Sequence, residues 1–146
     1  MSHDWLFAAR ITVHCLIGCV IGEVIGLAIG VTMQLDPIVT MILATILAFI
    51  TGMLLAILSV VKHSKATYLV AAKTVWLGEI ISISIMEIAM NAVDYWVGGV
   101  SAPSLLAPIF WIGLILAIPA GYLAALPVNY WLVRKHLKKC HYSKIS

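Results

Sequence analysis

A run of 25 residues without one charged side chain, from Pro37 to Val61, constrains this chain more than any other feature. A helix of about 20 apolar residues crosses the roughly 30 Å hydrocarbon core of a bilayer. Three more long apolar runs carry few charges. The sequence therefore predicts an all-α polytopic membrane protein with a single transmembrane domain over 1–146. The expected four-transmembrane-helix bundle has helices at about 9–35, 37–61, 72–97 and 106–134.

Composition supports the same class. Hydrophobic residues make up 63% of the chain and charged residues 10%, whereas about a quarter of the residues of a soluble domain are charged. Three cysteines are too few for a disulfide framework, and the sequence has no phosphate loop, nucleophile elbow or zinc-protease motif. We therefore expect membrane lipid as a partner, and neither enzymatic activity nor a nucleic-acid partner.

The positions of the basic residues predict the orientation of the bundle. Lys and Arg near the ends of spans stay on the cytoplasmic side. All nine fall on one side of the predicted spans: Arg10, Lys62, Lys65, Lys73, Arg134, Lys135, Lys138, Lys139 and Lys144. Asp36 and Asp94 fall on the other side. We expect both termini in the cytoplasm, with the basic tail 135–146 acting as a topology anchor or binding anionic lipid headgroups.

The first predicted helix carries two stripes of residues spaced by four. Gly18, Gly22, Gly26 and Gly30 form one, which is typical of a helix-packing seam in membranes. Cys15, Cys19 and Glu23 form the other, with His14 beside it. Residues at i and i+4 are neighbours on a helix, so we expect the second stripe to face the bundle interior.

The third predicted helix presents a matching polar face. Spacings of three and four align Glu79, Ser82, Met86, Glu87, Met90, Asn91 and Asp94. Counting about 1.5 Å per residue from Arg10 and Lys73 predicts two layers. The inner layer holds His14, Cys15, Cys19 and Glu79, and the deeper one holds Glu23, Met86 and Glu87.

The acids Glu23, Glu79 and Glu87 face no intramembrane Lys or Arg in this arrangement. A charged acid at the bilayer centre costs about 2.5–3.5 kcal/mol. Three solutions are open: protonated acids, a water-filled cavity, or a bound cation. Protonated acids that hydrogen-bond between helices are the purely structural alternative.

Thiol, thioether and imidazole groups together favour a soft cation, because Cys and Met select Cu(I). The predicted metal-handling residues are His14, Cys15, Cys19, Glu23, Glu79, Met86 and Glu87. Cysteines and methionines in membrane helices also serve as plain apolar packing, and that interpretation stays open.

Two segments resemble a known family. His14-Cys15-Leu16-Ile17-Gly18-Cys19-Val20-Ile21-Gly22-Glu23 is similar to the H-C-x-x-G-C-x-x-G-E motif of the small membrane proteins named for domain of unknown function 4396, and 127–132 resembles their P-V-N-x-W-L motif. The resemblance, from about residue 8 to 137, implies an integral membrane protein of bacteria or archaea with about four helices. The family contributes no established activity. Its members often end in a His-rich tail, of which His136, Cys140 and His141 remain here.

Two hypotheses follow for function. The first is a small protein of the cell membrane that binds or transports a copper-like cation through the bundle interior. The second is a non-catalytic accessory subunit of a larger membrane complex, with the glycines and acids contacting partner helices. A homo-oligomer is expected if the protein is a transporter. Pro119 should kink the fourth helix, either to shape the bundle or to expose a carbonyl group to a passing ion.

Overall fold

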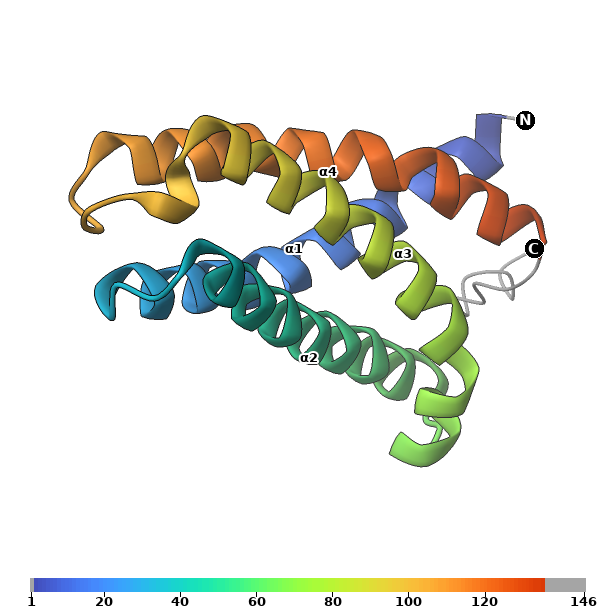
Figure 1. Cartoon of the computed structure of the whole chain (residues 1–146). Coiled ribbons are helices and arrows are strands. Elements are labelled where there is room, and N and C mark those ends of the chain that lie inside the picture. The colour runs from blue at the N-terminus through green and yellow to red at the C-terminus, as the bar shows by residue number, and fades with distance from the viewer. Residues whose placement is uncertain (1, 136–146) are drawn as a thin grey trace.

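The computed structural model describes residues 2–135, so the predicted basic tail 135–146 lies outside the described residues except for its first residue, Lys135. Within that range the chain forms four α-helices and one short 3-10 helix (Figure 1). Their bounds are α1 Ser2–Thr32, α2 Pro37–Ser64, α3 Tyr68–Val97, η1 Gly99–Ser101 and α4 Pro108–Arg134. Each α-helix is long and apolar enough to span a membrane. The prediction of an all-α, four-helix membrane bundle is confirmed.

The helix ends differ from the predicted ones by up to seven residues. α1 begins at Ser2 rather than at about 9, because no Gly or Pro interrupts the helical sequence before Arg10. α1 stops at Thr32 rather than 35, since Gln34 has a left-handed φ of 53°. The Asp36 carboxylate accepts a hydrogen bond from the Ile38 amide at 2.9 Å, which caps the start of α2.

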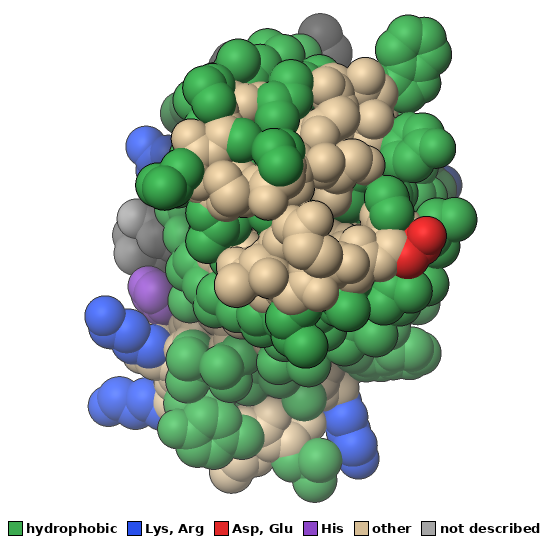
Figure 2. Space-filling view, turned by 60° about the vertical axis from the view of Figure 1, so that its left-hand side comes forward, with side chains coloured by type: hydrophobic (Ala, Val, Ile, Leu, Met, Phe, Trp, Pro, Cys, Tyr) green, Lys and Arg blue, Asp and Glu red, His purple; other side chains and the backbone are tan. Residues whose placement is uncertain are grey.

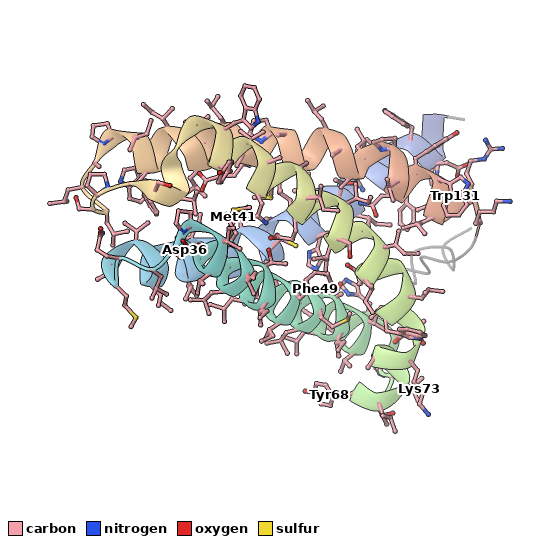
Figure 3. The ribbon with its side chains drawn as sticks, viewed as in Figure 1. Asp36, Met41, Phe49, Tyr68, Lys73 and Trp131 are labelled. Carbon is pink, nitrogen blue, oxygen red and sulfur yellow. The ribbon has the colours of Figure 1, made fainter. Side chains whose placement is uncertain are left out.

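The helices run up and down, so the bundle has two chemically different ends (Figure 1). One end, called the basic end here, holds the start of α1, the α2–α3 connection and the end of α4. The other, called the distal end, holds residues 33–36 and 98–107. Figure 3 shows Asp36 at the distal end and Lys73 and Trp131 at the basic end. Figure 2 shows hydrophobic side chains over most of the molecular face, with Lys and Arg at its margins.

α1 packs against α2 along the glycine stripe. A Cβ atom built on Gly18 would lie 2.9 Å from the Cα atom of Gly52, and one on Gly22 would collide with the Leu47 carbonyl group. The Thr51 hydroxyl group donates to the Gly18 carbonyl oxygen at 2.6 Å across the same seam. α2 contributes a stripe of its own with the same spacing: Thr40, Ala44, Ala48, Gly52, Ala56 and Val60. Small residues on both helices thus let the two backbones approach closely.

α3 and α4 form the second close pair, and α1 also contacts α4. Figure 1 shows α3 running diagonally from the end of α2 towards the start of α4, with α1 crossing behind it. The Asn129 amide of α4 donates to the Thr12 hydroxyl group of α1 at 2.9 Å, and both residues are buried. This crossed arrangement brings the middle of α1 and the middle of α3 together in the bundle interior.

Candidate functional site

The polar face of α3 is turned into the bundle along its whole length. All seven residues that the spacing aligned are buried: Glu79, Ser82, Met86, Glu87, Met90, Asn91 and Asp94. The side chains of Ile80, Ile88 and Trp96 on the same helix are exposed, which leaves the apolar side to lipid. α3 therefore carries an internal row of polar and sulfur groups that spans most of the membrane thickness.

Four sulfur-bearing side chains lie in one buried hydrophobic cluster near the middle of this row. They are Cys15 and Cys19 of α1 and Met86 and Met90 of α3, and the same cluster contains Ile83. Both cysteines are free, and the Cys15 Sγ atom lies 3.8 Å from the Ser82 Oγ atom. A Cβ atom on Gly121 of α4 would lie 2.7 Å from the Met90 Sδ atom, so this glycine makes room for the methionines.

The register between α1 and α3 differs from the one that the residue count predicted. The two-layer prediction placed Met86 deeper than the thiols, and in the structure Met86 belongs to the same buried cluster as Cys15 and Cys19. Cys15 lies opposite Ser82, three residues further along α3 than the predicted Glu79. The reason is that Arg10 and Lys73 do not mark equal depths, because α1 and α3 extend beyond their apolar runs and cross each other.

His14 does not join the sulfur cluster. Its side chain is exposed, and its Nε2 atom lies 3.5 Å from the Leu55 carbonyl oxygen of α2. Neighbouring residues on a helix diverge by about 100°, so the turn that buries Cys15 directs His14 elsewhere. His14 therefore stays outside any coordination sphere that the two thiols could form in this arrangement.

Glu23 and Glu87 are also buried in the bundle interior. Glu23 has no exposed surface, and neither of its carboxyl oxygens has a hydrogen-bond partner within residues 2–135. The Asn91 amide group lies 3.4 Å from the Glu87 Oε2 atom and 3.0 Å from the Thr45 hydroxyl oxygen. Glu23 interacts electrostatically with Glu87 and with Asp94. Three carboxyl groups thus lie in a part of the interior where the described chain places no basic side chain.

Glu79 and Asp94 mark the two ends of the acidic row. Glu79 is 5% exposed and lies towards the basic end, three residues before Ser82. Asp94 lies in the last turn of α3 and is 2% exposed. The sequence spacing aligned Asp94 with this polar face and placed it at the distal boundary, but Asp94 was not among the predicted metal-handling residues.

The predicted donor groups do not gather around a single point. Among the described residues, no three His, Cys, Asp or Glu side chains lie close enough together to hold one. The seven predicted metal-handling residues therefore do not form one coordination sphere. If the two thiols bind a metal ion, their additional ligands must therefore come from other residue types. The thioether groups of Met86 and Met90 belong to the same buried cluster as the thiols.

Pro119 lies inside the continuous helix α4, on its exposed side. It cannot donate to the carbonyl group of Ile115, whose side chain is 63% exposed. That carbonyl group therefore lies on the outer side of the helix. This position favours a role in shaping α4 over exposure of a carbonyl group to an ion in the interior.

Comparison with known proteins gives one assignment. No curated protein and no solved structure matches the chain. The profile of one family, described as a domain of unknown function (DUF4396), matches residues 4–138. This match covers all four helices, including the cysteine stripe of α1 and the polar face of α3. The chain belongs to the DUF4396 family of uncharacterised proteins.

Proposed function

We propose that this protein handles a soft metal cation, with copper(I) as the best-suited ion, by binding or transport through the interior of its helix bundle. The observation that carries the proposal is the buried cluster of Cys15, Cys19, Met86 and Met90, contributed by two helices. Thiolate and thioether ligands select Cu(I) over harder cations. A site of this kind needs no histidine, which is consistent with the position of His14 outside the cluster.

The buried acids supply the counter-charge in this proposal. Cys19 interacts electrostatically with Glu79 and Glu87, and Glu23 continues the cysteine stripe one turn further along α1. A cation that enters the interior would offset part of the cost of burying these carboxylates. The acids also offer a relay for protons, which would balance the movement of a cation. Copper would then be the cargo or the bound ion of the protein.

Elemental analysis tests the proposal directly. The protein is purified anaerobically in detergent, with copper in the growth medium, beside the double variant Cys15→Ser/Cys19→Ser. We expect near-stoichiometric copper in the wild type and none in the double variant, with equal helix content by circular dichroism. Cys140→Ser, outside the described residues, is the matched control and should retain the copper. Equal metal content in all three proteins would contradict the ligand assignment.

The orientation and location are also proposals. We infer a cell-membrane protein of a bacterium or archaeon with both termini in the cytoplasm. The support is that the described Lys and Arg residues lie at the basic end, whereas Asp36 lies at the distal end. In a cysteine-free background, Asp36→Cys should react with a membrane-impermeant maleimide on intact cells, and Lys65→Cys only after lysis. The reverse pattern would contradict this orientation.

The second candidate is an accessory subunit or a homo-oligomer, and one observation favours it. α2 is the least covered helix of the bundle, with an exposed aliphatic ridge spaced by four: Ile38, Ile42, Ile46, Ile50, Leu54 and Leu58. Such a ridge suits lipid or a partner helix. The glycine stripe does not add to this case, because α2 of the same chain already covers it. Co-purification of a partner with both wild type and the cysteine double variant, without copper in either, would favour the subunit role.

A further inference from the structure

Asp94 is turned inward where an acid could easily have faced water. It lies in the last turn of α3, beside the distal end of the bundle. Its neighbours Tyr95 and Trp96 are 56% and 89% exposed, whereas Asp94 is 2% exposed. The last turn of α3 therefore places its aromatic rings outside and its carboxyl group inside.

Two glycines make the space that this carboxyl group occupies. A Cβ atom on Gly99 of η1 or on Gly113 of α4 would collide with the Asp94 Oδ1 atom. η1 follows α3 directly, because Gly98 adopts a left-handed φ of 93° at the end of that helix. The turn at Gly98, the short helix η1 and the second turn of α4 thus form a niche for one carboxyl group.

No group in the described chain neutralises Asp94. Neither Oδ1 nor Oδ2 has a hydrogen-bond partner there. Glu23 of α1 interacts with Asp94 electrostatically, and Glu87 precedes it on α3 by two turns, so both of these neighbouring titratable groups are acids. The other charged or titratable side chains of the four helices and their caps are spread along the bundle. They are His3, Asp4, Arg10, His14, Cys15 and Cys19 on α1, Asp36 before α2, Lys62 and His63 on α2 and Lys65 after it, Tyr68, Lys73, Glu79 and Tyr95 on α3, and Tyr122, Tyr130 and Arg134 on α4 and Lys135 after it. None of these basic groups lies at the distal end.

The niche does not suit a metal ion. Hard cations such as Ca²⁺ and Mg²⁺ take six or more oxygen ligands, whereas the niche offers one carboxyl group between two glycines. Within residues 2–135 no three acidic, cysteine or histidine side chains gather to hold a metal. One proton neutralises one carboxylate without any further ligand. A buried carboxylate without a partner is otherwise strongly disfavoured.

We propose that Asp94 is a proton-binding site at the distal end of the bundle, separate from the sulfur cluster. The Asp94 carboxylate takes up one proton from water and becomes a neutral acid, and it returns that proton to water when it ionises. Val100 and Ser101 of η1, the two residues that follow Gly99, line a surface pocket of about 210 Å³ together with Gly30 and Gln34 of the α1 end. This site does not depend on the soft-metal proposal.

Infrared spectroscopy of the full chain in lipid at neutral pH tests the site. A protonated carboxyl group has a carbonyl stretch that lies above the amide band and shifts in heavy water, whereas a carboxylate absorbs at lower frequency. We expect the spectrum of Asp94→Asn to lose one protonated-carboxyl band relative to the wild type. Loss of a carboxylate band instead would overturn the proposal.

Two further variants complete the test. Asp36→Asn is the matched control, because Asp36 is exposed at the same end of the bundle and should contribute a carboxylate band. Gly113→Ala fills the niche, so we expect it to shift the frequency of the Asp94 band. A Gly113→Ala spectrum identical to that of the wild type would contradict the niche. If wild-type protein from copper-containing medium holds no metal but shows the Asp94 band, the soft-metal proposal is overturned and the proton-site proposal is retained.

Discussion

The Sγ atom of Cys15 lies 3.8 Å from the Oγ atom of Ser82, and this contact defines the register between α1 and α3. Met86 follows Ser82 by one turn of α3, as Cys19 follows Cys15 by one turn of α1. The register therefore brings both thiols and the two methionines into one buried cluster. A shift of one turn would instead place Glu79 opposite Cys15.

Met86→Leu should separate metal affinity from packing. Leucine has a volume close to that of methionine, so we expect the stability to fall by less than about 1.5 kcal/mol. Loss of the thioether ligand should weaken copper(I) binding at least about tenfold, which corresponds to about 1.4 kcal/mol. Competition with a copper(I) chelator measures the affinity. Met41→Leu on α2 is the control (Figure 3), because Met41 packs against a different cluster. Unchanged affinity in Met86→Leu would remove Met86 from the ligand set.

Glu23→Gln should keep the fold and weaken cation retention. The Glu23 side chain is wholly buried and its oxygens have no hydrogen-bond partner in the described chain, so no bond is broken by the substitution. Loss of the counter-charge should lower copper(I) affinity by about tenfold, or about 1.4 kcal/mol. The same chelator competition applies, with the exposed Asp4→Asn as control. Equal affinities of the two variants would show that Glu23 supplies no counter-charge.

Gly22→Leu should destabilise the folded chain itself. A side chain at this position would collide with the Leu47 carbonyl group and the Thr51 hydroxyl group of α2. Overpacking of this kind costs about 1–3 kcal/mol, and backbone contact places the expected loss at the upper end. Thermal unfolding in detergent measures the loss. Ile21→Leu is the control, because Ile21 is 46% exposed. A normal melting temperature for Gly22→Leu would mean that α1 and α2 do not meet at this seam.

Asn129→Ala tests the contact between the first and last helices. The Asn129 amide donates to the Thr12 hydroxyl group at 2.9 Å. Interhelical hydrogen bonds in membranes contribute about 0.6 kcal/mol on average and up to about 1.7 kcal/mol. We expect a loss in that range by unfolding in detergent, with Thr74→Ala, at an exposed position, as the control. If the two variants unfold alike, this bond adds nothing to the stability of the bundle.

The sequence alone predicted the fold class well, because long uncharged runs admit few alternatives to membrane-spanning helices. It also predicted which side of α3 is buried, since the period of a helix determines which residues share a face. It missed the small-residue stripe of α2, although Ala44, Ala48 and Gly52 have the same spacing as the glycines of α1. A search of every helix for that spacing would have paired α1 with α2.

The relative depth of residues on different helices could not be predicted from the sequence. Depth counted from Arg10 and Lys73 assumed that two charges mark one plane, whereas crossing helices place equal counts at different heights. His14 was assigned to the site for a different reason: it adjoins Cys15 in the sequence, but one step around the helix turns its side chain towards α2. The Asp94 niche depends on Gly99 and Gly113, which lie on different elements and meet only in the folded chain.

X-ray absorption spectroscopy of the copper(I)-loaded protein tests the central claim most directly. The spectrum reports which atoms surround the copper ion in the full chain. The sulfur cluster predicts a first coordination shell of sulfur atoms, with one sulfur fewer in Met86→Leu and no bound copper in Cys15→Ser/Cys19→Ser. A shell of nitrogen and oxygen atoms, or copper retained by the double cysteine variant, would contradict the account.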